Sequence, residues 1–576
     1  MIFVRKRFIT QDGLREVIAV LPEGEQDSME KSPLITIVSE KTGEDAAREL
    51  LQRFDLTRLI ETEKLIVYFP QCRDGLWEIS ESASLSPDEK FLQALPMQGM
   101  AFGPRRPSLD ICHLVGIGSG ADLVCSLSLK APSSISAATV CAIGGQGRLP
   151  SEGIIPSATP AILVDMPQTA ADLFCEMNKT DSREGNRFFR SCNPCQAVTV
   201  TDSAGFDPKS LWTALCSTVR RMNGAPEGLI VDRCYRLPED AVYRRNVVLR
   251  DGLSHDWVEV LPPSVLLGDP KKVPLILISH GMGGNPVDTA DQFGMHLIGK
   301  REGFITVYVF SSNHRGWNLN YAPGQPDDVA YYAALIDYLK AQYPIDESRI
   351  YTTGFSNGAG MAMLFALEHP EIVAAACPVD STFPYAASGR FRLPSRPEPY
   401  MKPEDAGEAP GFSGPPPMDR DAALAPLHRS LAAQKNRETP LRLPVMYFYG
   451  TRETEYPIRS GSNQELSMNF WKEFNGIPTA PLDDTLSGND AVGVLGMKIR
   501  ELHPDARYPE HCYTEHVFFN DEGLDAYHFM LMHGKAHDVH PIEAELGWRF
   551  VSRFSRDPDG TLHDAEAESD ENSKSG

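Results

Sequence analysis

Hydrophobic and polar positions along the chain alternate between the period of a strand and the period of a helix. Short runs rich in β-branched and aromatic residues, such as 274–280 and 305–309, predict buried strands. The stretches 43–54, 286–303 and 327–340 are amphipathic or mixed and predict helices, the last one opening with acidic residues. This alternation indicates an α/β fold with a mostly parallel sheet and helices on both faces.

The same pattern occurs twice. Residues 1–22 and 243–262 each contain two alternating runs around an Asp-Gly pair, which predicts a hairpin. Four landmarks recur at almost one spacing: Gly13 and Gly252 are 239 residues apart, Pro33 and Pro274 241, Val67 and Val307 240, and Gly116 and Gly354 238. Because four independent landmarks keep one spacing within three residues, we interpret the chain as two copies of one α/β domain.

The repeat sets the expected domain boundaries. We expect the first domain at 1–235 and the second at 236–556. The second copy carries a long proline-rich insertion, 383–443, and we expect it to form a lid or cap over the site, with a solvated excursion as the alternative. The acidic, small-residue stretch 557–576 predicts a disordered tail.

A candidate nucleophile lies in the second copy. Gly354-Phe-Ser356-Asn-Gly358 stands between a β-branched and aromatic strand, 350–353, and an apolar helix, 361–367. This is the strand-to-helix context of the G-x-S-x-G nucleophile elbow of α/β-hydrolases. Glycine tolerates the sharp turn, and the helix N-terminus behind Ser356 favours developing negative charge. The pattern therefore predicts a serine hydrolase.

A serine nucleophile needs a histidine base and a carboxylate that orients the histidine. In α/β-hydrolases the acid follows the serine along the chain and the histidine comes last. Glu453, a few residues after the predicted strand 444–449, is our candidate acid, and Glu455 is the alternative.

Three histidines compete for the base, and all precede the final predicted helix, 542–554. His533 still belongs to a strand, and His540 adjoins the proline that opens the helix. We therefore favour His537.

The loop His280-Gly-Met-Gly-Gly284 follows an early strand and predicts one side of an oxyanion hole, whose N–H donors would be those of Met282 and Asn357. The glycines, Gly281 first, let the backbone approach the substrate carbonyl. Trp317 and Tyr456 are candidate substrate-binding aromatics, although most aromatics in such domains fill the core.

The first copy differs where this chemistry would lie. Gly118 corresponds to Ser356, and Ser39-Glu40 corresponds to His280-Gly281. A carboxylate at that place would oppose an oxyanion. We therefore expect two tandem α/β-hydrolase-like domains of which the first lacks the catalytic residues and has a structural or dimerising role.

On these motifs the second copy resembles the polyhydroxybutyrate depolymerase and feruloyl esterase group of α/β-hydrolases. The matching pieces are residues 274–281, 346–361, 450–453 and 534–537. The resemblance implies a carboxylic ester hydrolase that works through an acyl-enzyme on a small or oligomeric ester, such as an aryl, feruloyl-type or hydroxyalkanoate ester. That family usually carries aspartate where this chain has Glu453, and glutamate can take the same role. The alternatives are a serine peptidase or amidase, and a binding or scaffold protein with a relic hydrolase fold.

Composition and charge limit the kinds of molecule that the protein is expected to bind. With 42% hydrophobic and 23% charged residues among 576, the chain reads as an ordinary soluble globular protein. Its net charge of -23 argues against nucleic acid or an anionic membrane as the main partner. Eleven cysteines without a framework spacing, and an N-terminus that turns charged after four residues, predict a cytoplasmic protein with reduced thiols. We expect no metal or organic cofactor, since the serine mechanism needs none.

Overall fold

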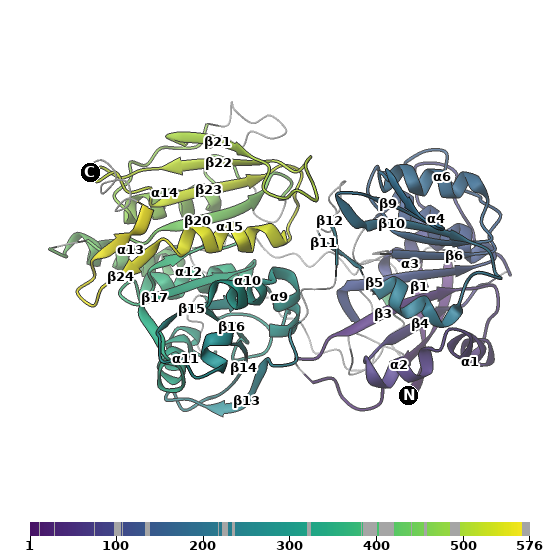
Figure 1. The fold of residues 1–576 in the computed structure, drawn as a ribbon, viewed down its shortest axis with the longest axis horizontal. Helices are drawn as coiled ribbons and strands as arrows, with labels where there is room; N and C mark the ends of the chain where they lie inside the picture. The colour runs from purple at the N-terminus through teal and green to yellow at the C-terminus, as the bar shows by residue number, and fades with distance from the viewer. Residues whose placement is uncertain are drawn as a thin grey trace. The chain divides into compact units, whose positions relative to one another are not determined.

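The structure is a computed structural model. It describes residues 1–10, 12–27, 29–73, 75–96, 105, 107–132, 139–216, 218–221, 229–232, 237–319, 324–381, 383, 400–401, 420–438, 440–453, 458–483 and 496–566. The chain divides into two compact units (Figure 1). One comprises Met1–Cys234 together with the short strand β19 (Tyr400–Met401), and the other begins at Tyr235.

The first unit is an α/β layer structure. Its strands are β1 (Ile2–Thr10), β2 (Gly13–Leu21), β3 (Ser32–Val38), β4 (Ile66–Pro70), β5 (Pro107–Ile117), β6 (Thr139–Ile143), β7 (Ala161–Val164), β8 (Ser182–Glu184), β9 (Arg187–Arg190) and β10 (Asn193–Thr201). Its helices are α1 (Glu44–Arg53), α2 (Leu56–Thr62), α3 (Pro87–Ala94), α4 (Ser119–Lys130), α6 (Gln168–Met177) and α7 (Leu211–Cys216). A separate ribbon pairs β11 (Thr218–Arg221) with β12 (Leu229–Asp232). β19 pairs with β1 at the edge of the sheet.

The second unit has the same kind of layers. Its sheet contains β13 (Val242–Val248), β14 (Ser254–Val260), β15 (Val273–Ser279), β16 (Ile305–Val309), β17 (Ile345–Gly354), β18 (Ala375–Ala376), β20 (Val445–Gly450), β21 (Lys498–Leu502), β22 (Tyr513–Phe518) and β23 (Tyr527–Met532). Its helices are α8 (Pro263–Leu266), α9 (Pro286–Phe293), α10 (Met295–Glu302), α11 (Asp328–Gln342), α12 (Asn357–Glu368), α13 (Arg420–Lys435), α14 (Asn463–Phe474) and α15 (Pro541–Val551).

Both sheets follow one strand order. The first runs β1-β2-β4-β3-β5-β6-β7-β10-β9-β8 inside its β19 edge, and the second runs β13-β14-β16-β15-β17-β18-β20-β23-β22-β21. In each sheet the central strands are parallel and the outer ones antiparallel. If the strands of each unit are numbered from one in chain order, with β19 left out, the two sheets have the same strand order. Two mixed, mostly parallel sheets of α/β-hydrolase-like order are therefore present, as the repeat predicted.

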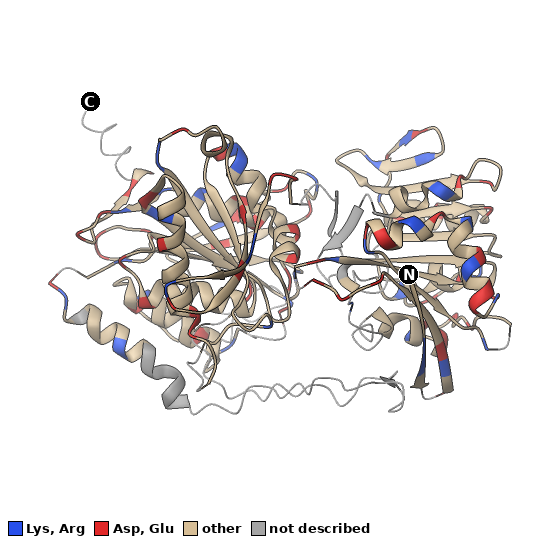
Figure 2. Cartoon of the chain, turned by 90° about the horizontal axis from the view of Figure 1, so that it is seen from below, with Lys and Arg blue, Asp and Glu red and all other residues tan. Residues whose placement is uncertain are grey.

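The central strands are continuous apolar runs because helices cover both faces of a parallel sheet. Every residue of β15 and of β16 is buried. In the second unit α12, which is buried along almost its whole length, packs against β17 and places the elbow at the carboxyl end of that strand. Acidic and basic residues are interspersed along the chain in both units (Figure 2).

Two expectations need correction. The stretch 286–303 forms two helices, not one, because Gly294 adopts a left-handed conformation (φ 62°) that ends α9 and begins α10. The disordered tail expected from 557 begins with a hairpin, in which β24 (Phe554–Arg556) pairs with β25 (Leu562–Asp564). Arg553 explains the second difference, since its guanidinium pairs with both Asp525 and Asp564.

The lid role expected for 383–443 falls mostly outside the described residues, which include Phe383, β19, α13 and the approach to β20. Among the helices of the described ranges, none has both the length and the apolar character needed to cross a membrane.

Candidate active site

Ser356 lies at the joint between β17 and α12 in a strained backbone conformation, with φ 55° and ψ −121°. The flanking glycines make this turn possible. A Cβ on Gly354 would lie 2.5 Å from the carbonyl oxygen of Gly358, and a Cβ on Gly358 would lie 2.3 Å from that of Ser279. The strand, the turn and the helix therefore approach so closely that neither position admits a side chain.

The structure brings the three predicted triad residues into one hydrogen-bonded line. Ser356 Oγ lies 2.9 Å from His537 Nε2, and His537 Nδ1 lies 2.5 Å from Glu453 Oε2. Because a carboxylate accepts only, Nδ1–H donates to Glu453 and Nε2 accepts from the serine hydroxyl. The Glu453 side chain is fully buried, whereas that of His537 is 25% exposed and open to an incoming molecule.

Strand order explains why these distant residues meet. Ser356 follows β17, Glu453 follows β20, and His537 follows β23, and these strands lie side by side in parallel with β18 between the first two. Their carboxyl ends therefore share one edge of the sheet, where sites of α/β folds lie.

The competing histidines have other partners. His533 Nε2 lies 2.7 Å from the Thr514 hydroxyl. His540 caps α15, where its Nδ1 accepts from the N–H of Ile542 at 3.1 Å. Burial lowers the pKa of His540 well below its usual value, which keeps this ring neutral as an acceptor. Glu455 and Tyr456 lie outside the described residues.

The buried ring of His280 stabilises the loop 280–284, which is predicted to supply one side of the oxyanion hole. Its Nε2 accepts from the N–H of Ser311 at 3.1 Å, so Nδ1–H donates to the Gly281 carbonyl at 2.7 Å. Burial lowers the pKa of His280 to about 4, so the ring is neutral at physiological pH. Within the described part of the chain, the N–H groups of Met282 and Asn357 have no hydrogen-bond acceptor, as the donors of an oxyanion hole require.

Trp317 joins the oxyanion loop to the elbow. Its backbone N–H donates to Asn357 Oδ1 at 2.7 Å, and its indole Nε1–H donates to the His280 carbonyl at 2.8 Å. The side chain is only 5% exposed and belongs to the buried core of the second unit, where it also packs against Tyr332 of α11. Gly281 packs beside the ring of Phe355. A Cβ on Gly281 would lie 3.0 Å from Cδ1 of that ring. Substrate contact by Trp317 and Gly281 stays a prediction.

The sequence interpretation missed three buried charged residues beside the triad, Asp380, Lys535 and Glu543. Lys535 Nζ lies 3.0 Å from Asp380 Oδ2 and 2.6 Å from Glu543 Oε1. One signal was available, because Asp380 directly follows the apolar run 375–379, in the place where an acid ends a strand of the sheet.

Asp380, Glu453 and His537 are also ligand types for a metal ion, and their ligand atoms lie within 4.8 Å of one another. However, two ligands of one tetrahedral zinc ion stand about 3 Å or more apart, since each bond is about 2.0–2.2 Å long. The 2.5 Å contact between His537 and Glu453 fits a shared proton better than an ion. A second such group, Glu501, His503 and Cys512, lies at the end of the β21–β22 hairpin and is largely exposed.

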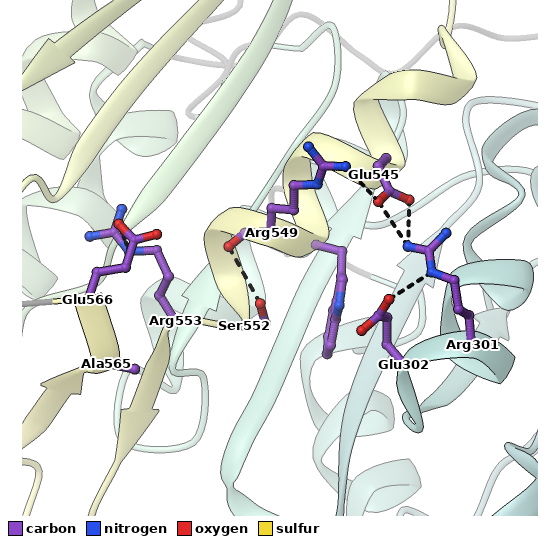
Figure 3. Close-up of a pocket in the computed structure, with 9 residues that line it drawn as sticks. Arg301, Glu302, Glu545, Arg549, Ser552, Arg553, Ala565 and Glu566 are labelled. Atoms are coloured by element: carbon purple, nitrogen blue, oxygen red, sulfur yellow. Dashed lines mark hydrogen bonds and ion pairs between the residues drawn. The ribbon is translucent and has the colours of Figure 1, made fainter. Parts of the chain in front are cut away.

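A surface groove lies elsewhere in the second unit (Figure 3). It has a volume of about 790 Å³, and its lining residues belong to α10, to α15 and to the segment that follows α15. Arg301 pairs there with Glu302 and Glu545, and Arg549 also pairs with Glu545. These charges neutralise one another, and the groove includes none of the triad residues.

Known proteins that are similar to this chain include esterases. Residues 256–388 match the family described as Esterase PHB depolymerase. The chain is 30% identical over 120 residues to "Putative esterase NocK" of Nocardia uniformis subsp. tsuyamanensis, covering 20% of this chain and 35% of that protein. It is 29% identical over 122 residues to "Poly(3-hydroxyalkanoate) depolymerase C" of Paucimonas lemoignei, covering 19% and 28%. The chain thus spans about a third of the length of these relatives.

Solved structures of esterases are also similar. An acetyl xylan esterase from Aspergillus awamori has a TM-score of 0.37 at 14% identity, over 54% of this chain and 99% of that one. A ferulic acid esterase has a TM-score of 0.28 at 14% identity, over 42% and 87%. The family match contains the Ser356 elbow and the His280 loop. Residues 256–388 are thus similar to the esterase PHB depolymerase family, which the motifs of the second copy resemble.

Proposed function

We propose that the chain is a serine-dependent carboxylic ester hydrolase that works through an acyl-enzyme. The observation that carries this proposal is the hydrogen-bonded line from Ser356 through His537 to Glu453 at a strained elbow. The substrate class is a small or oligomeric ester of the aryl, feruloyl-type or hydroxyalkanoate kind. The names of these relatives, an esterase and a hydroxyalkanoate depolymerase, agree with that reaction class.

The geometry supports a two-step reaction. His537 Nε2 takes the proton of the Ser356 hydroxyl as its oxygen attacks the ester carbonyl, and Glu453 stabilises the imidazolium that forms. The N–H groups of Met282 and Asn357 hold the oxyanion. The imidazolium then protonates the departing alcohol. A water molecule, deprotonated by the same histidine, attacks the acyl-serine and releases the acid.

We also propose that the first unit is non-catalytic. Gly118 keeps an elbow conformation (φ 62°, ψ −126°), but Glu40 Oε1 accepts from the N–H of Ser119 at 2.6 Å, where an oxyanion would bind. A hydrogen-bonded pair, Asp165 and Ser203, follows β7 and β10, the strands that correspond to those before Glu453 and His537. Among the described residues, these contacts support a unit without a nucleophile or a base at its elbow, and we assign it a structural role.

Substitution of the nucleophile tests the ester hydrolase. The panel comprises short-chain nitrophenyl esters, feruloyl esters and 3-hydroxybutyrate oligomers, with a matched amide to separate an esterase from a peptidase. Ser356→Ala should lower kcat by about 10⁴-fold or more, because no other group supplies the attacking oxygen. Ser203→Ala, in the first unit, is the control and should leave turnover unchanged. A Ser356→Ala variant with wild-type turnover would contradict the proposal.

A further inference from the structure

A second carboxylate faces the proposed catalytic histidine. Asp380 comes just after β18, between the strands that carry Ser356 and Glu453. Its side chain is fully buried. One of its oxygens lies within 4.8 Å of both a ring nitrogen of His537 and a carboxylate oxygen of Glu453. The imidazole is therefore flanked by two carboxylates, of which Glu453 makes the hydrogen bond.

Asp380 also holds the loop that carries His537. Its Oδ2 accepts from Lys535 Nζ at 3.0 Å and from the backbone N–H of Asp538 at 3.1 Å. These two residues stand on either side of His537 in the chain. The Lys535 backbone is tied in turn to the acid loop, since its carbonyl accepts from the N–H of Arg452 at 2.9 Å. The Asp380 carboxylate thus links the residues before and after His537 to the segment that follows β18.

The charges around this carboxylate do not balance without His537. Asp380, Glu453 and Glu543 are three buried acids, and Lys535 is the one lysine that pairs with them in the described part of the chain. Asp380 Oδ1 is buried without a hydrogen-bond partner among the described residues, which is costly for a carboxylate oxygen. A protonated His537 would supply a second cation beside it.

Two tyrosines and one histidine that face the cluster are neutral. Burial raises the pKa of Tyr513, on β22, and of Tyr447, on β20, well above the usual value. Burial lowers the pKa of His540, which faces Lys535. For the acids themselves, burial raises the pKa of Asp380 to about 6 and that of Glu543 to about 7. Such shifts fit a site in which acids outnumber cations.

We propose that Asp380 is a positioning residue of this site, which fixes the His537 loop through Lys535 and Asp538 and shares with Glu453 the stabilisation of protonated His537. The proposal rests on the ester hydrolysis proposed above. Its physical basis is that an opposite charge within about 4–6 Å favours the charged form of a titrating group, by about one to three pKa units. Asp380 therefore acts when the serine proton has moved to the imidazole.

The first test is the pH profile of kcat/KM for Asp380→Asn, which keeps the shape of the side chain and removes its charge. The acidic limb should move to lower pH by about one unit, because the imidazolium loses a nearby negative charge. At neutral pH kcat should fall about tenfold while KM changes little, as expected for an interaction made in the transition state. Asp525→Asn is the control, since Asp525 is a partly buried acid paired with Arg553 and His528, and it should leave the limb in place.

The second test is a double-mutant cycle with Glu453→Gln. If the two carboxylates share one task, Asp380→Asn should cost a larger fold-change in kcat in the Glu453→Gln background than in the wild type. Equal fold losses together with an unmoved acidic limb would overturn the proposal and leave Asp380 a purely structural residue. Asp380→Ser, which leaves room for water, replaces Asp380→Asn in both tests if that variant does not fold.

Ser356→Ala, measured in parallel, separates the two proposals. A dead Ser356→Ala variant beside an Asp380→Asn variant with a wild-type pH profile refutes only the role of Asp380. A Ser356→Ala variant with full turnover refutes the ester hydrolase itself, and with it the role of Asp380.

Discussion

At the scale of the residue, the site is built from groups held in unfavourable states. Ser356 has a positive φ, and His280 is a fully buried imidazole. Each such state costs on the order of 1–3 kcal/mol and persists because its surroundings enforce it. For Ser356 the enforcing contacts are the glycines on either side, and for His280 they are the two hydrogen bonds to Ser311 and Gly281.

His280 should make stability depend on pH. Its folded-state pKa of about 4 lies below the ordinary value of 6.5, so between these values the unfolded chain binds more protons. The stabilisation is complete above pH 6.5 and is lost as the pH falls to 4, by on the order of 3 kcal/mol. Compared with His280→Gln, the wild type should therefore lose more unfolding free energy over this window.

Denaturant unfolding at several pH values between 4 and 8 measures this difference. His503→Gln, at an exposed position, is the control and should follow the wild-type curve. Parallel curves for wild type and His280→Gln would show that the ring is not kept neutral by burial.

At the scale of the element, the sequence predicted the helices and strands that depend on the local pattern of hydrophobic and polar residues. The apolar runs 274–280 and 305–309 became β15 and β16, and the helical spacing at 327–340 became α11. The elbow was also predictable, because the glycines, the strand and the helix are neighbours in the chain. Gly294 was missed as a helix end, since a single glycine inside a helical pattern is often tolerated.

Residues that meet through the sheet were harder to predict. The sequence placed Glu453 and His537 by chain order alone, whereas Asp380 belongs to no motif. Its nearness to His537 follows from the position of β18 between β17 and β20, which the sequence pattern does not specify. Lys535 belongs to the late loop before the final helix, and only the structure shows that it is fully buried between two acids.

The hairpin after α15 gives an element-scale prediction. Ending the chain after Arg556 removes β25 and with it Asp564, a carboxylate partner of Arg553. That change should lower the free energy of unfolding by about 1–3 kcal/mol, because a half-buried guanidinium loses a charged hydrogen-bond partner. Ending the chain after Glu566 keeps β25 and should leave stability unchanged. Denaturant unfolding of both truncations checks this, and equal stability of the two would contradict it.

At the scale of the whole molecule, each unit has its own sheet and its own buried core. All the residues of the proposed site belong to the second unit. We therefore expect the fragment 236–576 to fold and to keep serine-dependent turnover, since a unit with its own core can fold alone. Circular dichroism and the ester panel, with Ser356→Ala in the same fragment as control, test this. A folded but inactive fragment would show that the first unit contributes to the reaction.

The Gly118 elbow has a consequence for the history of the chain. A Cβ at Gly118 would lie 2.8 Å from Glu40 Oε1, so a serine there would have to displace this carboxylate. A mutation that restored the serine alone would meet the carboxylate, and one that removed the glutamate alone would restore no nucleophile. Recovery would need the serine, a displaced glutamate and also a base where Ser203 now stands, so the loss of this elbow works as an evolutionary ratchet that no single substitution reverses.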